Sequence, residues 1–312
     1  MRGDRLQSDV LDLYRTYDAP PEGFDPRKAT DKELVHHGFP RRPDAETEPE
    51  LDRLWKRAFA RQTSFVKAEL EIDPVMSKRD PLRGRGSEFG PSGWGGAAVD
   101  RFELGLKDPT TIVFGQWVVP EVVPFEPLLS GDITAGFWVG LDGLTNNQVL
   151  QAGIAVTLTP EYWVSPYTNV NWWAWTEWYT EKYQDPAVAV MNFPVATGNT
   201  VFFVVCAPQP DFGYVSMLNV STGHGTSVGI NARPGITSKG DTAEWIVEGI
   251  SDELPAFYPV TFNDCTAGTR NDVFNLSPDG LVTEIQGSGG EPITKTQIAS
   301  PQSAVVYWEA WS

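Results

Sequence analysis

Apolar residues in the first part of the chain recur at intervals of three and four, which is the spacing of a stripe along one side of a helix. Residues 30–33 form a Thr-Asp-Lys-Glu capping box and predict the start of a short helix. A second stripe around Trp55 predicts a helix from about residue 50 to residue 71. The pattern therefore predicts a helical N-terminal arm over residues 1–85.

From residue 86 onward the pattern changes to short runs in which glycine, proline, threonine, valine and aromatic residues alternate. Runs of this kind, separated by turns, are typical of strands in an all-β sandwich. We therefore predict that residues 86–312 form one β-sandwich domain. The expected strands are 111–119, 136–141, 149–158, 171–179, 200–207, 214–219, 242–250, 259–263 and 304–311.

Successive side chains of a strand point to opposite faces, so residue parity separates two faces in each run. One face of the run 149–158 is entirely apolar, whereas Gln151 and Gly153 lie on the other. If the apolar faces form the core, the second faces line a groove in which Gly140 and Gly153 leave room for a ligand backbone. An ordinary sheet face covered by the arm is the alternative. The groove residues would be Trp138, Asp142, Gln151, Trp175, Glu177, Tyr179 and Glu244.

Charge is distributed unevenly between the two parts. Residues 1–85 hold 17 of the 24 Lys/Arg and 17 of the 41 Asp/Glu, so the whole net charge of −17 belongs to the remainder. An acidic body repels nucleic acids and anionic membranes, and we expect neither as a partner. The chain as written begins without the apolar core of a signal peptide, and no run reaches the length of a membrane span.

Residues that commonly bind metals are scarce. There are three histidines and two cysteines, with no H-E-x-x-H motif and no Cys/His cluster, so we expect no metal and no other cofactor. Cys206 and Cys265 can form one disulfide or remain as two buried thiols, and their spacing does not decide between these.

Seven motifs follow one another in the order and approximate spacing of the glutamic peptidases, the eqolisins. Each motif alone is weakly specific, but the ordered set covers about residues 92–248, and the chain resembles this family. The motifs are Ser92–Ala97, Trp117–Pro120, Trp138–Gly143, Leu150–Gly153, Ala174–Tyr179, Asn219–Gly223 and Ala243–Glu248.

The resemblance implies an acid endopeptidase with a catalytic Gln/Glu dyad, on an antiparallel β-sandwich of jelly-roll or concanavalin-like type. The catalytic residues would be Gln151 in the L-Q-x-G motif and Glu244 in A-E-W-I-V-E, with Glu248 as the fallback. One departure is Trp173, where similar members often have Asp. The implied substrate-binding residues are Trp138, Asp142, Trp175, Glu177 and Tyr179.

These residue types suit peptide hydrolysis. A carboxylate such as Glu244 can take a proton from water and return it to the leaving amine. The amide of Gln151 can donate to the oxyanion at any working pH, including acid. We therefore expect the substrates to be proteins or peptides. The family resemblance implies an extracellular site of action. The charge count leaves two alternatives for the arm: a structural arm packed on its neighbour, or a prosegment whose cations face the acidic body and which loosens at low pH.

Two other functions remain open from the residues alone. A jelly-roll glycoside hydrolase would use Glu177 and Glu244 as its pair of carboxylates. A lectin-like module would stack sugar rings on the tryptophans and use Glu244 only as a hydrogen-bond acceptor. The motifs L-Q-x-G and A-E-W-I-V-E favour the peptidase.

Overall fold

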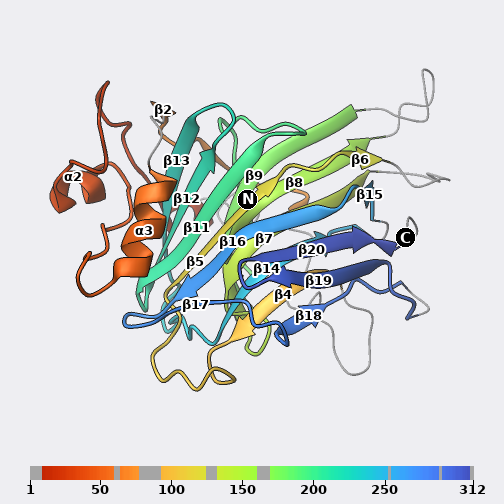
Figure 1. Cartoon of the computed structure of the whole chain (residues 1–312). Coiled ribbons are helices and arrows are strands. Elements are labelled where there is room, and N and C mark those ends of the chain that lie inside the picture. Colours follow the sequence, from red (N-terminus) through yellow and green to blue (C-terminus); the bar gives the residue numbers. More distant parts are fainter. Residues whose placement is uncertain are drawn as a thin grey trace.

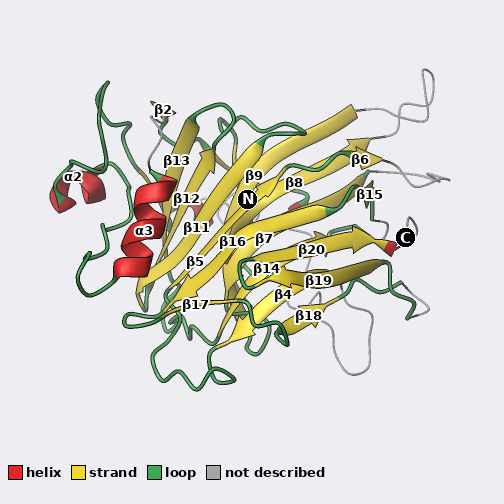
Figure 2. Cartoon of the chain, in the orientation of Figure 1, coloured by secondary structure: helices red, strands yellow, loops and turns green. Residues whose placement is uncertain are grey.

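Two stacked β-sheets make up most of the computed structural model, which describes residues 9–59, 64–76, 93–123, 132–159, 169–251, 254–287 and 290–309 (Figures 1 and 2). One sheet has ten strands in the order β1-β13-β12-β11-β5-β16-β20-β19, with β17 beside β16 and β2 beside β13. The other has eight, in the order β18-β4-β14-β7-β8-β9-β10-β3, and β15 pairs with β6 separately. Pairing is antiparallel except between β13 and β2. The predicted antiparallel β-sandwich is confirmed.

The strands of the ten-stranded sheet are β1 (Tyr14–Thr16), β2 (Ser64–Phe65), β5 (Ile112–Val118), β11 (Thr200–Gln209), β12 (Phe212–Asn219), β13 (His224–Asn231), β16 (Val260–Gly268), β17 (Val273–Asn275), β19 (Thr294–Ser300) and β20 (Ser303–Trp308). Those of the eight-stranded sheet are β3 (Leu70–Ile72), β4 (Trp94–Asp100), β7 (Ile133–Leu141), β8 (Gln148–Thr159), β9 (Asn169–Thr180), β10 (Val188–Val190), β14 (Thr242–Gly249) and β18 (Leu281–Thr283). The remaining elements are β6 (Val122–Val123), β15 (Ala256–Phe257), α2 (Asp31–His36) and α3 (Pro49–Ala58).

The inner faces of the two sheets share one apolar core. The face predicted from alternate residues of 150–156 in β8 lies in this core, fully buried or nearly so. Trp117 of β5 stacks on Phe203 of β11 with ring centroids 5.1 Å apart. The indole N–H of Trp245 in β14 donates to the carbonyl of Phe114 in β5 and so joins the two sheets directly. Because alternate side chains fill this core, each sheet has a second face available for other contacts.

The N-terminal arm packs on the sandwich along two routes. Its helices α2 and α3 lie against the outer face of the ten-stranded sheet, where Trp55 and Phe59 share an apolar cluster with Phe114 and Phe202 (Figure 1). Its three strands extend the sheets themselves: β1 and β2 pair with β13, and β3 pairs with β10. The arm therefore covers one sheet face and adds an edge strand to each sheet, which protects edges that would otherwise be open.

The first predicted arm helix is confirmed, and the second is too long. Thr30 caps α2, with its side chain and that of Glu33 forming the expected reciprocal capping box. The second helix ends at residue 58 instead of 71, because residues 64–72 pair with strands of the body. Phe65 remains in the same apolar cluster as Trp55, which is why the spacing suggested one continuous helix.

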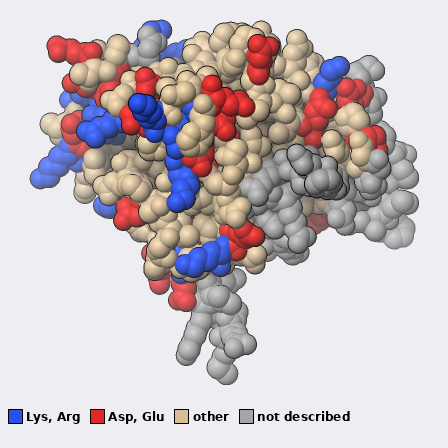
Figure 3. All heavy atoms as spheres, turned by 90° about the horizontal axis from the view of Figure 1, so that it is seen from below, with Lys and Arg blue, Asp and Glu red and all other residues tan. Residues whose placement is uncertain are grey.

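Ion pairs contribute little to holding the arm on the body. Among the described residues, one ion pair joins the arm to the body, and it is formed by Arg57 and Asp264. The other ion pairs made by described arm cations are with carboxylates of the arm itself. Viewed from below, positive and negative side chains are interspersed (Figure 3). The expectation that arm cations clasp the acidic body is therefore wrong for these residues, and apolar burial with strand pairing holds the arm instead.

Both cysteines are buried free thiols, which decides between the two alternatives left by the sequence. The sequence pattern did not predict strands β4, β6, β10, β13, β15, β17, β18 and β19 or the arm strands. In the described part of the chain, no helix combines the length and apolar character needed to cross a membrane.

Because Trp55 is 1% exposed and joins the arm to the outer sheet face, we expect Trp55→Ala to destabilise the protein by about 3–5 kcal/mol. Chemical denaturation followed by tryptophan fluorescence and circular dichroism measures this. Met191→Ala, at a residue that is 54% exposed, is the control and should change stability by less than about 0.5 kcal/mol. Equal stability of the two variants would contradict a structural role for α3.

Candidate active site

Four neighbouring strands bring the predicted catalytic residues into a single row across the eight-stranded sheet. Glu244 of β14 pairs with Gly140 of β7, Gly140 pairs with Gln151 of β8, and Gln151 pairs with Glu177 of β9. Directly paired residues of adjacent strands point to the same face. Gln151 and Glu244 therefore share the outer face, two strand spacings or roughly 10 Å apart at Cα. Their side chains can both reach an atom that lies over Gly140.

The two glycines of this face both lie against Trp138. A Cβ at Gly153 would lie 2.6 Å from Cβ of Trp138, and a Cβ at Gly140 would lie 2.9 Å from its indole ring and 3.2 Å from Cβ of Gln151. The expectation of room for a substrate backbone is therefore wrong for Gly153, whose space Trp138 occupies. Gly140 instead keeps Glu244 and Gln151 free of an intervening side chain, with the edge of the indole beside them.

Gln151 is fully buried and its orientation is set by Glu177. The Gln151 Nε2 amide donates to Oε1 of Glu177 at 2.6 Å. A carboxylate can only accept, so the amide nitrogen must face Glu177 and the amide oxygen must face away from it. The hydroxyl of Thr176 donates to the Gln151 backbone carbonyl at 2.9 Å and fixes the strand here. One N–H of the amide is thus committed to Glu177, which leaves the second for another acceptor.

Glu244 is a fully buried carboxyl whose two oxygens have no hydrogen-bond partner among the described residues. Burial raises the pKa of Glu244 well above its usual value, and the nearby negative charge of Asp142 raises it further. Thr242 and the backbone of Leu144 oppose this rise, but neither completes a hydrogen bond of ordinary geometry to the carboxyl. The amide oxygen of Gln151 likewise has no partner in the described part of the chain. Buried polar atoms of this kind are suited to contact water or substrate.

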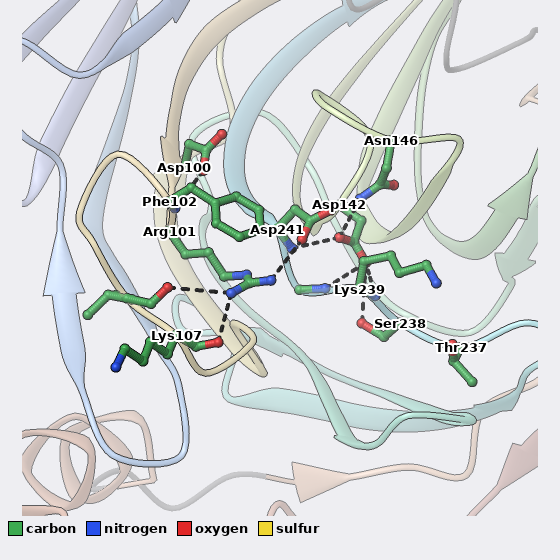
Figure 4. Close-up of polar contacts among 12 residues, drawn as sticks. Asp100, Arg101, Phe102, Lys107, Asp142, Asn146, Thr237, Ser238, Lys239 and Asp241 are labelled. Carbon is green, nitrogen blue, oxygen red and sulfur yellow. Dashed lines mark hydrogen bonds and ion pairs between the residues drawn. The ribbon is translucent and has the colours of Figure 1, made fainter.

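Asp142 lies at the end of β7 and anchors the loop that leads into β14 (Figure 4). Its carboxylate accepts hydrogen bonds from the backbone N–H groups of residues 239–241, at 2.9 to 3.1 Å, and from Asn146 at 2.8 Å. Longer contacts come from Ser238 and Gln148. With its oxygens committed in this way, Asp142 fixes the approach to Glu244 instead of presenting a free carboxylate to the groove.

A second set of contacts joins two further loops to the same anchor. Asn146 also donates to Asp241 at 3.0 Å, and Asp241 accepts from Arg101 at 3.2 Å (Figure 4). Arg101 in turn donates to the backbone carbonyl of Lys107 at 2.9 Å. The loops after β4, β7 and β13 are thereby held together at the end of the sheet next to Glu244. The sequence contained no motif that predicted this network.

Aromatic residues form the rest of the site face. The Trp138 indole N–H donates to Glu248 at 3.0 Å, and its ring meets that of Trp94 edge to face at 4.8 Å. Trp175 and Tyr179 belong to the same buried cluster. Of the seven predicted groove residues, six thus share this face, and Asp142 differs because its side chain turns into the loop at the strand end.

The N-terminal arm reaches this face directly after β3. The backbone N–H of Asp73 donates to the carbonyl of Ala187, and the Asp73 carboxylate accepts from the backbone of Val75 and Met76 and from the Trp173 indole. Met76 is fully buried in the cluster that contains Trp138. Sequence reasoning missed these residues, although Trp173 had already been identified as a departure from the family pattern.

The row also bears on the glycosidase alternative. Glu177 and Glu244 are separated by three strand spacings, or roughly 14 Å at Cα. Paired carboxyl groups of glycosidases lie about 5–5.5 Å or 6.5–9.5 Å apart and face each other across the scissile bond. In addition, Glu177 is already bonded to Gln151, which lies between them. The geometry therefore gives no support to these two residues as a glycosidase pair.

Comparisons with known proteins identify the family and support the fold. The model of the Peptidase A4 family matches residues 92–308. Scytalido-glutamic peptidase, solved with a peptide-based transition state analog, is similar at 20% identity and a TM-score of 0.55, covering 69% of this chain and 98% of that one. SCP-B, described as a member of the eqolisin family and solved with the tripeptide Ala-Ile-His, is similar at 19% identity and a TM-score of 0.53, with the same coverage. Among curated proteins there is no significant match.

The raised pKa of Glu244 predicts a pH-dependent effect on stability. A carboxyl with a raised pKa in the folded state binds its proton more tightly there than in the unfolded chain. Its contribution to stability is therefore complete below the ordinary carboxyl pKa and is lost as the pH rises through the folded pKa. We expect Glu244→Gln to raise the Tm at pH 7, because it removes a buried carboxyl whose ionised form is favoured in the unfolded chain, and to change the Tm less at pH 4.

Thermal unfolding followed by circular dichroism at both pH values tests this expectation. Glu103→Gln, at an exposed carboxyl without a hydrogen bond among the described residues, is the matched control and should leave the Tm unchanged at either pH. A Tm at pH 7 that is lower for Glu244→Gln than for the parent would show that partners stabilise the carboxylate.

Proposed function

This chain belongs to the Peptidase A4 family, the glutamic peptidases, and on that premise we propose that it is an acid endopeptidase with Gln151 and Glu244 as its catalytic dyad. Peptidase activity itself follows from family membership. The observation that carries the finer proposal is the row in which Glu244, Gly140 and Gln151 are directly paired on three neighbouring strands. This register directs a buried carboxyl and a buried amide toward the same point.

In the proposed reaction, the Glu244 carboxylate takes a proton from a water molecule as the water oxygen attacks the peptide carbonyl carbon. The carbonyl oxygen becomes an oxyanion, and the amide N–H of Gln151 that is not bonded to Glu177 donates to it. Protonated Glu244 then gives its proton to the amide nitrogen as the carbon–nitrogen bond breaks. One water is consumed, and a carboxylic acid and an amine are released.

The surroundings of the dyad suit each role. Burial raises the pKa of Glu244, so the protonated form that donates a proton in the last step is favoured while the carboxyl is shielded from water. Contact with water and a peptide favours the carboxylate, which is the form needed in the first step. Gln151 has no titrating group and remains a donor in acid. Glu177 acts as a positioning residue, because it holds the amide with its nitrogen in a defined direction.

We infer that the aromatic face binds the substrate. Trp138, Trp175 and Tyr179 offer apolar surface next to the dyad, and such surface favours apolar or aromatic side chains of a peptide. No metal or cofactor is required for the proposed steps, because water, one carboxyl and one amide supply the base, the acid and the oxyanion donor.

Substitutions in the row test the dyad. Glu244→Gln should abolish cleavage of casein at acidic pH, and Gln151→Ala should lower kcat by about 10²–10³ because it removes the oxyanion donor. Glu248→Gln keeps an acceptor for the Trp138 indole and should retain much of the activity. Glu177→Gln likewise keeps an acceptor for the Gln151 amide and should also retain much of it. Glu177→Leu removes the acceptor and should lower kcat more than it changes KM. An inactive Glu248→Gln with an active Glu244→Gln would assign the catalytic carboxyl to position 248.

We further propose that the arm, residues 1–85, has two roles ahead of the peptidase domain, residues 86–312. Residues 9–59 and 64–72 are structural, because their loss would expose the apolar cluster of Phe114 and Phe202 and two sheet edges. Residues 73–76 act as a cover of the site face, in the manner of a prosegment, through Met76 and the contacts of Asp73. Substrate binding along this part of the site face then requires movement of this short segment rather than loss of the whole arm.

Asp73→Ala tests the cover, because it removes the acceptor for Trp173 and for the backbone of Val75 and Met76. We expect kcat/KM for a peptide substrate to rise about threefold to tenfold, since each hydrogen bond is worth about 1 kcal/mol. Asn192→Ala is the control, because it releases the arm from the body at Lys67 and Glu69, away from the dyad. A fall in kcat/KM for Asp73→Ala alone would instead make this segment part of the substrate site.

A further inference from the structure

A cavity of about 690 Å³ lies between the arm and the outer face of the ten-stranded sheet. Phe39 and Leu51 of the arm line one side, and Ile112, Cys206 and Phe212 of the sheet line the other. The residues of this cavity come from the opposite face of the sandwich to the one that carries Gln151 and Glu244. The cavity is therefore separate from the proposed active site and has no part in the proposed reaction.

The interior of this cavity offers apolar contacts and few free polar groups. The Tyr214 hydroxyl is already bonded to the carbonyl of Gly38 and to Ser227. Burial raises the pKa of the Cys206 thiol to about 12, so it remains neutral and behaves as a small apolar group. The volume lies within the range of about 300–1,000 Å³ that is usual for small-molecule sites. The body of a ligand here would be apolar.

The mouth of the cavity carries two arginines that differ in their partners. Arg41 forms an ion pair with Glu48 at 2.7 Å, which offsets its charge. Arg270 is exposed and has no hydrogen bond or ion pair among the described residues. It also borders a second hollow, which is lined by Asp108 and Asn271 as well. The net charge of −17 repels anions at long range, but an exposed guanidinium without a direct partner offers a short-range ion pair to the negative head of a ligand whose body fills the apolar cavity.

We propose that this cavity binds a small amphiphile, with an apolar chain between the arm and the sheet and a terminal carboxylate at Arg270. Such a ligand contacts the arm and the body at the same time, so its binding stabilises the docked arm by mass action. A medium-chain fatty acid and a short peptide with an apolar C-terminal residue share this chemistry. The proposal does not depend on the identity of the catalytic residues.

Binding to the full chain at pH 7, measured by titration calorimetry and by the shift in Tm, tests the proposal with three probes. Decanoate has the chain and the charge, 1-decanol has the chain alone, and N-acetyl-Phe-Leu has a peptide carboxylate. We expect decanoate to bind and raise the Tm, and 1-decanol to bind more weakly. Tighter binding of N-acetyl-Phe-Leu than of decanoate would also support the proposal and would identify the ligand as a peptide rather than a fatty acid. Absence of binding by both carboxylates would overturn it.

Two pairs of variants assign the charge effect to the mouth of the cavity. Arg270→Gln should weaken decanoate binding roughly fivefold, as expected for an exposed ion pair, and leave 1-decanol unaffected, whereas Lys295→Gln should change neither. Val35→Glu adds a negative charge beside the cavity and should also weaken decanoate binding, while Val282→Glu, at a similarly exposed residue elsewhere, should not. Equal effects of a variant and its control would overturn the carboxylate assignment.

Cys206→Phe fills the cavity and should remove binding of both decanoate and 1-decanol, and circular dichroism shows whether the fold is kept. If that variant fails to fold, the exposed positions Arg270 and Val35 still decide the question. Casein cleavage should be the same in all these variants, because the cavity and the dyad lie on opposite faces of the sandwich. Unchanged decanoate binding in folded Cys206→Phe would place the ligand elsewhere and overturn the proposal.

Discussion

The register of β14, β7, β8 and β9 is the constraint on which the rest of the site depends. It aligns Glu244, Gly140, Gln151 and Glu177 in one row, so that a carboxyl and an oriented amide share a face. A shift by one residue in any of these strands would move its polar residue into the core. The inward residues make such a shift costly, because Trp245, next to Glu244, is buried between the sheets and bonded to the carbonyl of Phe114.

Around this row, polar contacts orient some groups and leave others free. Gln151 is held by Glu177, and the loop before β14 is held by the carboxylate of Asp142. Glu244 has no comparable partner among the described residues, and burial favours its protonated form. A site with fixed neighbours and one uncompensated carboxyl stores an unfavourable interaction at that carboxyl, which is the proposed reacting group. Contact with water or with a peptide can relieve it, which connects the stability of the fold with the proposed chemistry.

The arm links the two faces of the sandwich. Its helices bury apolar surface on the ten-stranded sheet, where the cavity near Arg270 lies, and its last described segment brings Met76 to the candidate site face. Between these points its strands continue both sheets. A change at the cavity and a change at the site face therefore act on one continuous segment. The contacts that hold it are mainly apolar burial and backbone pairing, which acid alone does not remove.

Local patterns in the sequence determined the strands β7, β8, β9 and β14, their two faces and the capping box at Thr30, because alternation and helix capping depend on neighbouring residues only. Parity also placed Gln151 and Glu244 on the same side of their strands, and the ordered motifs indicated the peptidase family. Only the tertiary structure decided that Gly140 lies between these two residues, that Gly153 accommodates Trp138, and that Asp142 anchors a loop. It also converted the predicted second half of an arm helix into β2 and β3, and it brought Asp73 to Trp173. These outcomes depend on pairing between segments that are far apart in the chain, and such pairing leaves no periodic signal in either segment.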